Sequence, residues 1–217
     1  MPPLPNQNDS FWDQVAKATN DGRFLYLQMA AYALVREGSS FDFGRAHILV
    51  DSILSEEPRR WMAAAGGRDI WDRLGGAITR GILFATICRR LDLSLPPHRE
   101  ACLLASGMGS SSESDQKGCL SALSDILHPE EGRFSDDISA QTSIRLRPME
   151  PDLLGERFAL KGHTSDHLLS PVTHPLDDLL PLALRTEALG TAEFLGLFGK
   201  DFGDTPEFQR WLMTAID

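Results

Sequence analysis

The sequence predicts a mainly α-helical protein: a helical bundle, then a winged-helix-like module with a small β-hairpin, then further short helices. Three observations support this fold class. Apolar residues recur at helical spacing between about residues 10 and 92. In the short segment TSIRLRP, Ile144 and Leu146 alternate with Arg145 and Arg147 with the period of a strand. After residue 150, prolines and glycines recur at intervals that leave room only for short helices.

The composition is that of a folded chain, and its pattern changes twice. Of the 217 residues, 42% are hydrophobic and 24% are charged, which is ordinary for globular proteins and unlike disordered ones. The changes in pattern predict a helical arm domain over 1–92, a winged-helix-like module over 93–160 and short C-terminal helices over 161–217.

The arm is expected to contain several helices separated by polar or glycine-rich breaks. Ser10 suits the N-cap of a first helix. Residues 23–37 are apolar on nearly all sides, which is typical of a buried helix and predicts the spine of the arm. A helix from about residue 43 is followed by one that starts near Pro58 and stops at the glycine pair 66–67.

The last helix of the arm is predicted over residues 69–91. Its apolar residues have helical spacing, slightly weakened by two glycines, and its arginines fall at other positions. These arginines are Arg73, Arg80, Arg89 and Arg90.

The module after the arm is expected to begin with two short helices. Pro96 suits the first turn of one, and residues 115–127 form the other. Gln141–Arg147 would then be the second strand of the wing, with residues 132–139 as its antiparallel partner. Arg145 and Arg147 would face outward, and two charges are too few for a DNA-contacting patch.

The rest of the chain is expected to be helical with frequent breaks. Pro151 suits the first turn of a helix in the segment PMEPDLLGE, which we interpret as a structural joint against the wing. Further breaks are predicted at Gly162, Pro171, Pro175, Gly190 and Gly203.

Charge and cysteine usage exclude several classes of function. The formal net charge of −10 arises wholly after residue 100, where 9 Lys+Arg stand against 19 Asp+Glu, so nucleic acid is not an expected partner. Cys88, Cys102 and Cys119 are odd in number and lie in apolar patterns, which is typical of a reducing compartment and predicts a cytoplasmic location. No signal-peptide pattern or membrane-spanning segment is recognised.

Four segments in order resemble the region that follows the nucleotide-binding core in bacterial STAND-type NTPases, which are signal-transduction ATPases with numerous domains. The segments are DGRFLYLQMAAYAL, EEPRRWMAAAGG, RLRPMEPDLLGERFAL and FLGLFGKDFGDTPEF. The resemblance implies a helical arm plus winged helix that closes over bound nucleotide and connects to a sensor. It also implies that Gly22 and Arg23 match the family's Gly-x-Pro element against the nucleotide base, although Phe24 stands in place of the proline.

The nucleotide-binding core itself is missing from the sequence. A P-loop requires G-x-x-x-x-G-K-[ST], and the sole Gly-Lys pair, Gly199 and Lys200, lacks both outer requirements. ATP hydrolysis by this chain alone is therefore not expected, and no cofactor is predicted. The leading hypothesis is a non-catalytic regulatory or scaffold domain that binds a protein partner, such as a nucleotide-binding domain or a second copy of itself.

Two other functions stay open. His163 and His167 stand four residues apart, with His174 further on, and this spacing on a helix places two imidazoles where zinc could bind. A metal-dependent enzyme, or a thiol enzyme using one cysteine, is therefore the alternative, although Thr164 replaces the glutamate of H-E-x-x-H and a solvated segment is the default interpretation. A winged-helix transcription regulator is the weaker alternative.

One more group is a candidate for protein interaction. Arg59, Arg60 and Trp61 are residue types that favour interfaces. The simpler interpretation, which we prefer, is that Trp61 packs inward while the two arginines stay solvated, because this is ordinary helix amphipathicity.

Overall fold

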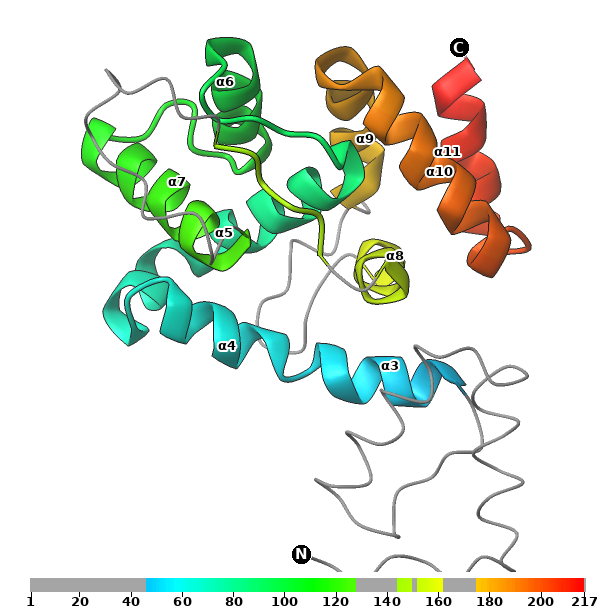
Figure 1. Cartoon of the computed structure of the whole chain (residues 1–217), viewed down its shortest axis with the longest axis horizontal. Helices are drawn as coiled ribbons and strands as arrows, with labels where there is room; N and C mark the ends of the chain where they lie inside the picture. The colour runs from blue at the N-terminus through cyan, green and yellow to red at the C-terminus, as the bar shows by residue number, and fades with distance from the viewer. Residues whose placement is uncertain (1–45, 128–143, 150–151, 162–174, 217) are drawn as a thin grey trace, which may run out of the picture. The chain divides into compact units, whose positions relative to one another are not determined.

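The computed structural model describes residues 46–127, 144–149, 152–161 and 175–216 (Figure 1). The chain divides into two compact units, Met1–Glu57 and Pro58–Asp217. Of the first unit, the structure describes the helix α3 (Ala46–Leu54), in which Val50 and Leu54 are buried. The expected first helix and the expected spine over 23–37 lie outside the described residues.

The described part of the chain is mainly helical, as the sequence predicts. In chain order the helices are α3 (Ala46–Leu54), α4 (Glu57–Ala64), α5 (Arg68–Cys88), α6 (Pro96–Ala105), α7 (Glu113–Leu127), α8 (Asp152–Lys161), α9 (Pro175–Thr186), α10 (Ala188–Phe202) and α11 (Pro206–Ile216). None of these described helices is both long and apolar enough to cross a bilayer.

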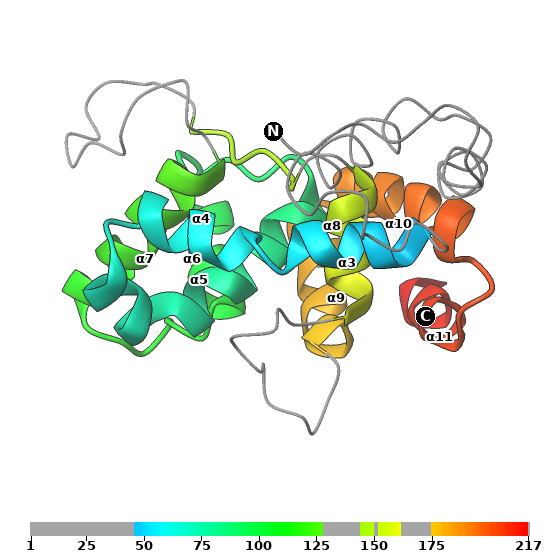
Figure 2. The same ribbon diagram turned by 90° about the horizontal axis from the view of Figure 1, so that it is seen from below.

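Helix α5 is the centre of the second unit. It contacts α6, α7, α8, α9 and α10. Figures 1 and 2 show α6 and α7 on one side of α5 and α10 and α11 on the other. Its largest fully buried apolar side chains are Ile78, Ile82, Leu83, Phe84 and Ile87. The predicted boundaries near residues 92 and 160 both lie inside this unit and stay predictions about its finer division.

Several helix ends are where the sequence predicts them. Helix α4 has Pro58 in its first turn, and the chain turns after it at Gly66 and Gly67, whose φ angles are +98° and +105°. Only glycine adopts such angles without strain. Helix α6 begins at Pro96, and α7 begins at Glu113, two residues before the predicted start.

The predicted break at Gly190 is wrong, because this glycine lies inside α10. The break falls at Glu187, whose carboxylate accepts a hydrogen bond from the Gly190 amide at 3.5 Å and so caps the helix. Gly190 serves a different purpose: a Cβ atom there would overlap the backbone carbonyl of Cys88. The glycine allows α10 to approach the end of α5 closely.

The segment around Arg145 is extended, as predicted, but its described partner is not the one expected. An isolated antiparallel bridge joins Arg145 to Asp92. The Leu93 amide donates to the Ile144 carbonyl and the Leu146 amide to the Leu91 carbonyl, both at 2.8 Å. The proposed partner over 132–139 lies outside the described residues, so the hairpin stays a prediction.

Two buried contacts tie this extended segment to the helices. The Met149 amide donates to the hydroxyl of Thr86 on α5 at 3.1 Å, and that hydroxyl donates to the Ile82 carbonyl at 2.8 Å. The Arg147 amide donates to the Leu127 carbonyl at the end of α7 at 3.2 Å. The segment is thereby held against α5 on one side and α7 on the other.

Candidate functional site

The candidate site begins where α5 ends. Arg89 caps this helix in the left-handed conformation with a φ of +58°, and its amide donates to the Ala85 carbonyl at 2.9 Å. A non-glycine residue with positive φ is uncommon and ends the helix sharply. The chain therefore leaves α5 at Arg90 and continues into residues 91–93, which hydrogen-bond to residues 144–146 around the isolated bridge. The end of α5 and the Arg145 segment thus become neighbours.

The start of α10 forms another wall of the site. Because Gly190 lies against the carbonyl of Cys88, the first turn of α10 stands next to the end of α5. Glu193, in the second turn of α10, accepts a hydrogen bond from Arg90 at 3.2 Å and lies 3.8 Å from the guanidinium of Arg89. Two arginines are thus oriented by one carboxylate.

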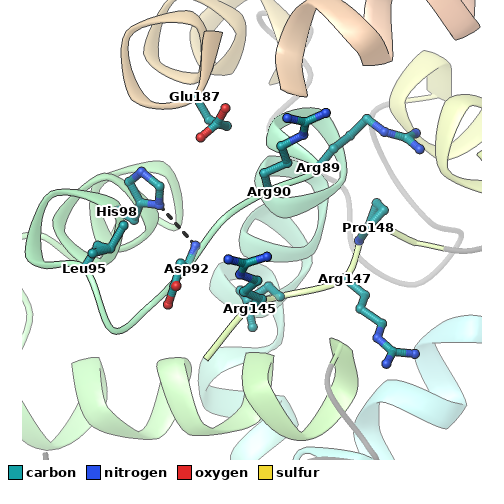
Figure 3. Close-up of a pocket in the computed structure, with 10 residues that line it drawn as sticks. Arg89, Arg90, Asp92, Leu95, His98, Arg145, Arg147, Pro148 and Glu187 are labelled. Carbon is teal, nitrogen blue, oxygen red and sulfur yellow. Dashed lines mark hydrogen bonds between the residues drawn. The ribbon is translucent and has the colours of Figure 1, made fainter. Parts of the chain in front are cut away.

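These segments enclose an open cleft of about 810 Å³. It is lined by Arg89, Arg90, Asp92, Leu95, His98, Arg145, Leu146, Arg147, Pro148 and Glu187. Figure 3 shows Arg90 and Arg145 on the side nearest His98 and Glu187, whereas Arg89 and Arg147 extend away from those two residues. Four guanidinium groups against two carboxylates make this a cationic cleft in a chain whose formal net charge is −10.

The arginines of the cleft differ in whether a carboxylate pairs with them. The side chain of Arg90 is 57% exposed and is paired with Glu193. Arg145 is exposed, and within the described ranges its guanidinium forms no hydrogen bond or ion pair. An exposed guanidinium keeps its donors available, so Arg145 is the cation of this cleft best placed to receive an anion.

His98 and Asp92 are fixed by hydrogen bonds at the base of the cleft. The amide of Asp92 donates to Nδ1 of His98 at 3.1 Å, drawn as the dashed line in Figure 3. A ring nitrogen that accepts carries no proton, so the neutral ring has its proton on Nε2 and offers a donor there. The Asp92 carboxylate accepts from the amide and hydroxyl of Ser94 at 2.9 and 2.6 Å and from the Ile144 amide at 3.2 Å. We therefore assign Asp92 a structural role.

The thiols lack the properties of a catalytic nucleophile. Cys88, Cys102 and Cys119 are free and buried. Burial raises the pKa of Cys119 to about 11, and it raises the pKa values of Cys88 and Cys102 further. A thiol nucleophile acts as the thiolate, which these three groups do not form near neutral pH.

The residues predicted to form sites are placed as follows. Arg59 and Arg60 are exposed on α4, whereas Trp61 is buried and packs edge-on against Phe158 at 5.5 Å between ring centroids. This arrangement is the inward packing that the sequence analysis prefers. Gly22, Arg23, His163, His167 and His174 lie outside the described residues. Within the ranges the structure covers, no cluster of three or more His, Cys, Asp or Glu side chains could hold a metal ion.

Comparison of the chain with protein-family models, with curated proteins and with solved structures finds no match.

The sequence analysis does not predict this cleft, although it names all four of its arginines. Arg89 and Arg90 were assigned to the polar side of a helix, and Arg145 to the outer face of a wing strand. Each segment alone is consistent with a solvated face. Only the pairing of 91–93 with 144–146 brings the two groups together. Covariation between these segments is the signal that would have indicated it.

Proposed function

We propose that the chain is a non-catalytic regulatory or scaffold domain that binds an acidic segment of a protein partner in the arginine-lined cleft. The observation that carries this proposal is the exposed guanidinium of Arg145, beside Arg90 and His98, in a cleft open to solvent. Recognition of acidic motifs by clusters of arginine is a recurring mode of peptide binding. The residues that line the cleft offer several hydrogen-bond donors, and none of these lining residues is a serine, threonine or cysteine.

The partner class follows from the resemblance to STAND-type NTPases. In that setting the partner is a nucleotide-binding domain or a second copy of this chain. The reduced, buried thiols support a cytoplasmic location for this complex. Nucleic acid is not proposed, because the acidic balance after residue 100 opposes phosphate backbones outside the cleft.

The finer architecture that we propose is a winged-helix-like module over 93–160. Its support is the order of α6, α7 and the extended segment around Arg145. Nuclear Overhauser contacts between the backbones of 132–139 and 141–147 are expected in solution. A chain that gives contacts from 141–147 to 91–93 but none to 132–139 has no wing.

The binding proposal is tested with an acidic polymer. Fluorescein-labelled poly-L-glutamate is titrated with the full chain, and fluorescence anisotropy measures its binding at several salt concentrations. We expect Arg145→Gln to weaken binding by roughly tenfold to a hundredfold, because a hydrogen bond to a charged group contributes about 1.5–3 kcal/mol. Binding should also weaken as the salt concentration rises.

The matched control is Arg185→Gln. Arg185 is an exposed arginine on α9 that does not line the cleft, so its loss changes the net charge equally. Equal weakening by the two variants would mean that net charge alone attracts the polymer. Absence of binding to the wild-type chain would also refute the proposal.

A further inference from the structure

We infer that the anionic group received by the cleft is a phosphoryl dianion carried by a phosphorylated side chain of the partner. This inference rests on the proposed function and names the chemistry of its ligand. It follows from the kind of cation in the cleft and from the donors that Arg145, Arg90 and His98 offer on one side of it.

The cations of the cleft are all arginines. The described lysines, Lys117, Lys161 and Lys200, do not line it. Guanidinium presents a planar fork of N–H donors that fits two oxygens of one phosphoryl group, whereas an ammonium acts as a point charge. The same fork also fits the two oxygens of a carboxylate, so the arginines indicate an oxyanion with at least two oxygens.

The donors on one side of the cleft favour a phosphoryl group over a single carboxylate. Of the four guanidinium groups in the lining, those of Arg90 and Arg145 lie on the side nearest His98, whereas those of Arg89 and Arg147 extend away from it. A phosphorylated side chain carries about −1.5 to −2 at pH 7 and has three acceptor oxygens. A glutamate carboxylate has only two oxygens for the same donors.

The donors near Arg145 suit several oxygens at once. Arg145 has no competing partner among the described residues, Arg90 is half-exposed beside it, and Nε2–H of His98 is a neutral donor on the same side of the cleft. Asp92 competes little, because its carboxylate already accepts three hydrogen bonds. We therefore assign Arg145 the central contact and Arg90 and His98 the flanking ones.

The walls of the cleft add a place for an apolar neighbour of the phosphorylated residue. Leu95 is 46% exposed at the start of α6 and lines the cleft together with Pro148. A volume of about 810 Å³ accommodates a phosphorylated side chain and the residue next to it. The expected ligand is thus a phosphorylated residue followed or preceded by an apolar one.

The experiment uses three labelled peptides that differ at one position, with phosphoserine, glutamate or serine beside a leucine. Anisotropy titrations with the full chain are expected to rank them phosphoserine, glutamate, serine, with at least a tenfold preference for phosphoserine over glutamate. Affinity for the phosphopeptide should fall below about pH 6, where the phosphoryl group takes up its second proton.

Two variants test the geometry. Arg145→Lys keeps the charge but removes the fork, so it should weaken phosphopeptide binding several-fold, whereas Arg185→Lys should leave it unchanged. His98→Asn keeps an acceptor for the Asp92 amide and removes the Nε2 donor, and it should weaken phosphopeptide binding several-fold. Circular dichroism of each variant checks that the fold is retained.

The outcomes separate this inference from the function on which it rests. Equal affinity for the phosphoserine and glutamate peptides, with both lost in Arg145→Gln, would overturn the phosphoryl inference and keep the acidic-partner proposal. No binding of either peptide that depends on Arg145 would overturn both. If inorganic phosphate binds as tightly as the phosphopeptide, the ligand is free phosphate and the assignment to a phosphorylated partner is wrong.

Discussion

Replacing Gly190 with alanine is expected to destabilise the second unit, because the new methyl group would occupy the space of a backbone carbonyl. The new Cβ atom would overlap the carbonyl oxygen of Cys88. It would also lie 3.0 Å from the carbonyl carbon of Cys88. Cys88 is fully buried at the end of α5, so it cannot move aside as a flexible side chain would. Either α10 shifts away from α5 or the end of α5 distorts.

The size of this effect follows from two opposing terms. Overpacking of a core lowers the free energy of unfolding by up to about 3 kcal/mol. Because the clash at Gly190 is with backbone atoms, which cannot rotate away, we expect Gly190→Ala to lie at the upper end of this range. Alanine is favoured over glycine inside a helix by about 1 kcal/mol, which leaves a net loss of about 2 kcal/mol. For a unit of this size the melting temperature should fall by roughly 4–8 °C.

Thermal and urea unfolding, followed by circular dichroism, measure this change. The matched control is Gly196→Ala in the same helix, where a Cβ atom meets nothing within 4 Å. That variant should be more stable than wild type by about 0.5–1 kcal/mol through helix propensity alone. The reasoning is refuted if Gly190→Ala is as stable as Gly196→Ala. Since the approach at Gly190 also positions α10 beside the cleft, Gly190→Ala should weaken poly-L-glutamate binding as well.

Two further predictions concern the interior, and each has its own measurement. Thr86→Val removes the hydroxyl that accepts from the Met149 amide, and leaving that amide unpaired should lower the free energy of unfolding by about 1–3 kcal/mol in urea titrations. Thr79→Val should cost less, since the Thr79 hydroxyl donates only to a carbonyl of its own helix; equal losses would contradict the assignment. Burial raises the pKa of Cys119 from 9.0 to about 11, so its contribution to stability is complete below pH 9 and is lost as pH rises towards 11, by about 1.4 kcal/mol per pH unit. Cys119→Ala should show a shallower decline across this window than wild type, and an unchanged slope would mean that this thiol does not remain protonated in the folded state.

Much of the helical architecture is encoded locally. The start of α6 at Pro96 and the turn after α4 at Gly66 follow from what proline and glycine permit at each position. The long helix α5 follows from its apolar spacing, and its two neighbouring glycines did not break it. These features depend on neighbours within a few turns, so a single sequence is sufficient to predict them.

The candidate site could not be predicted in this way, because it is made by contacts between distant segments. Gly190 has the local signature of a helix break, yet close approach to Cys88 places it inside α10. Arg90 and Arg145 each have the signature of a solvated surface, and the pairing of Asp92 with Arg145 brings them to one cleft. The sequence by itself determined a mainly helical, acidic chain without a P-loop. Only the tertiary structure decided which charges face one another, because packing against α5 sets the distance between segments that are remote along the chain.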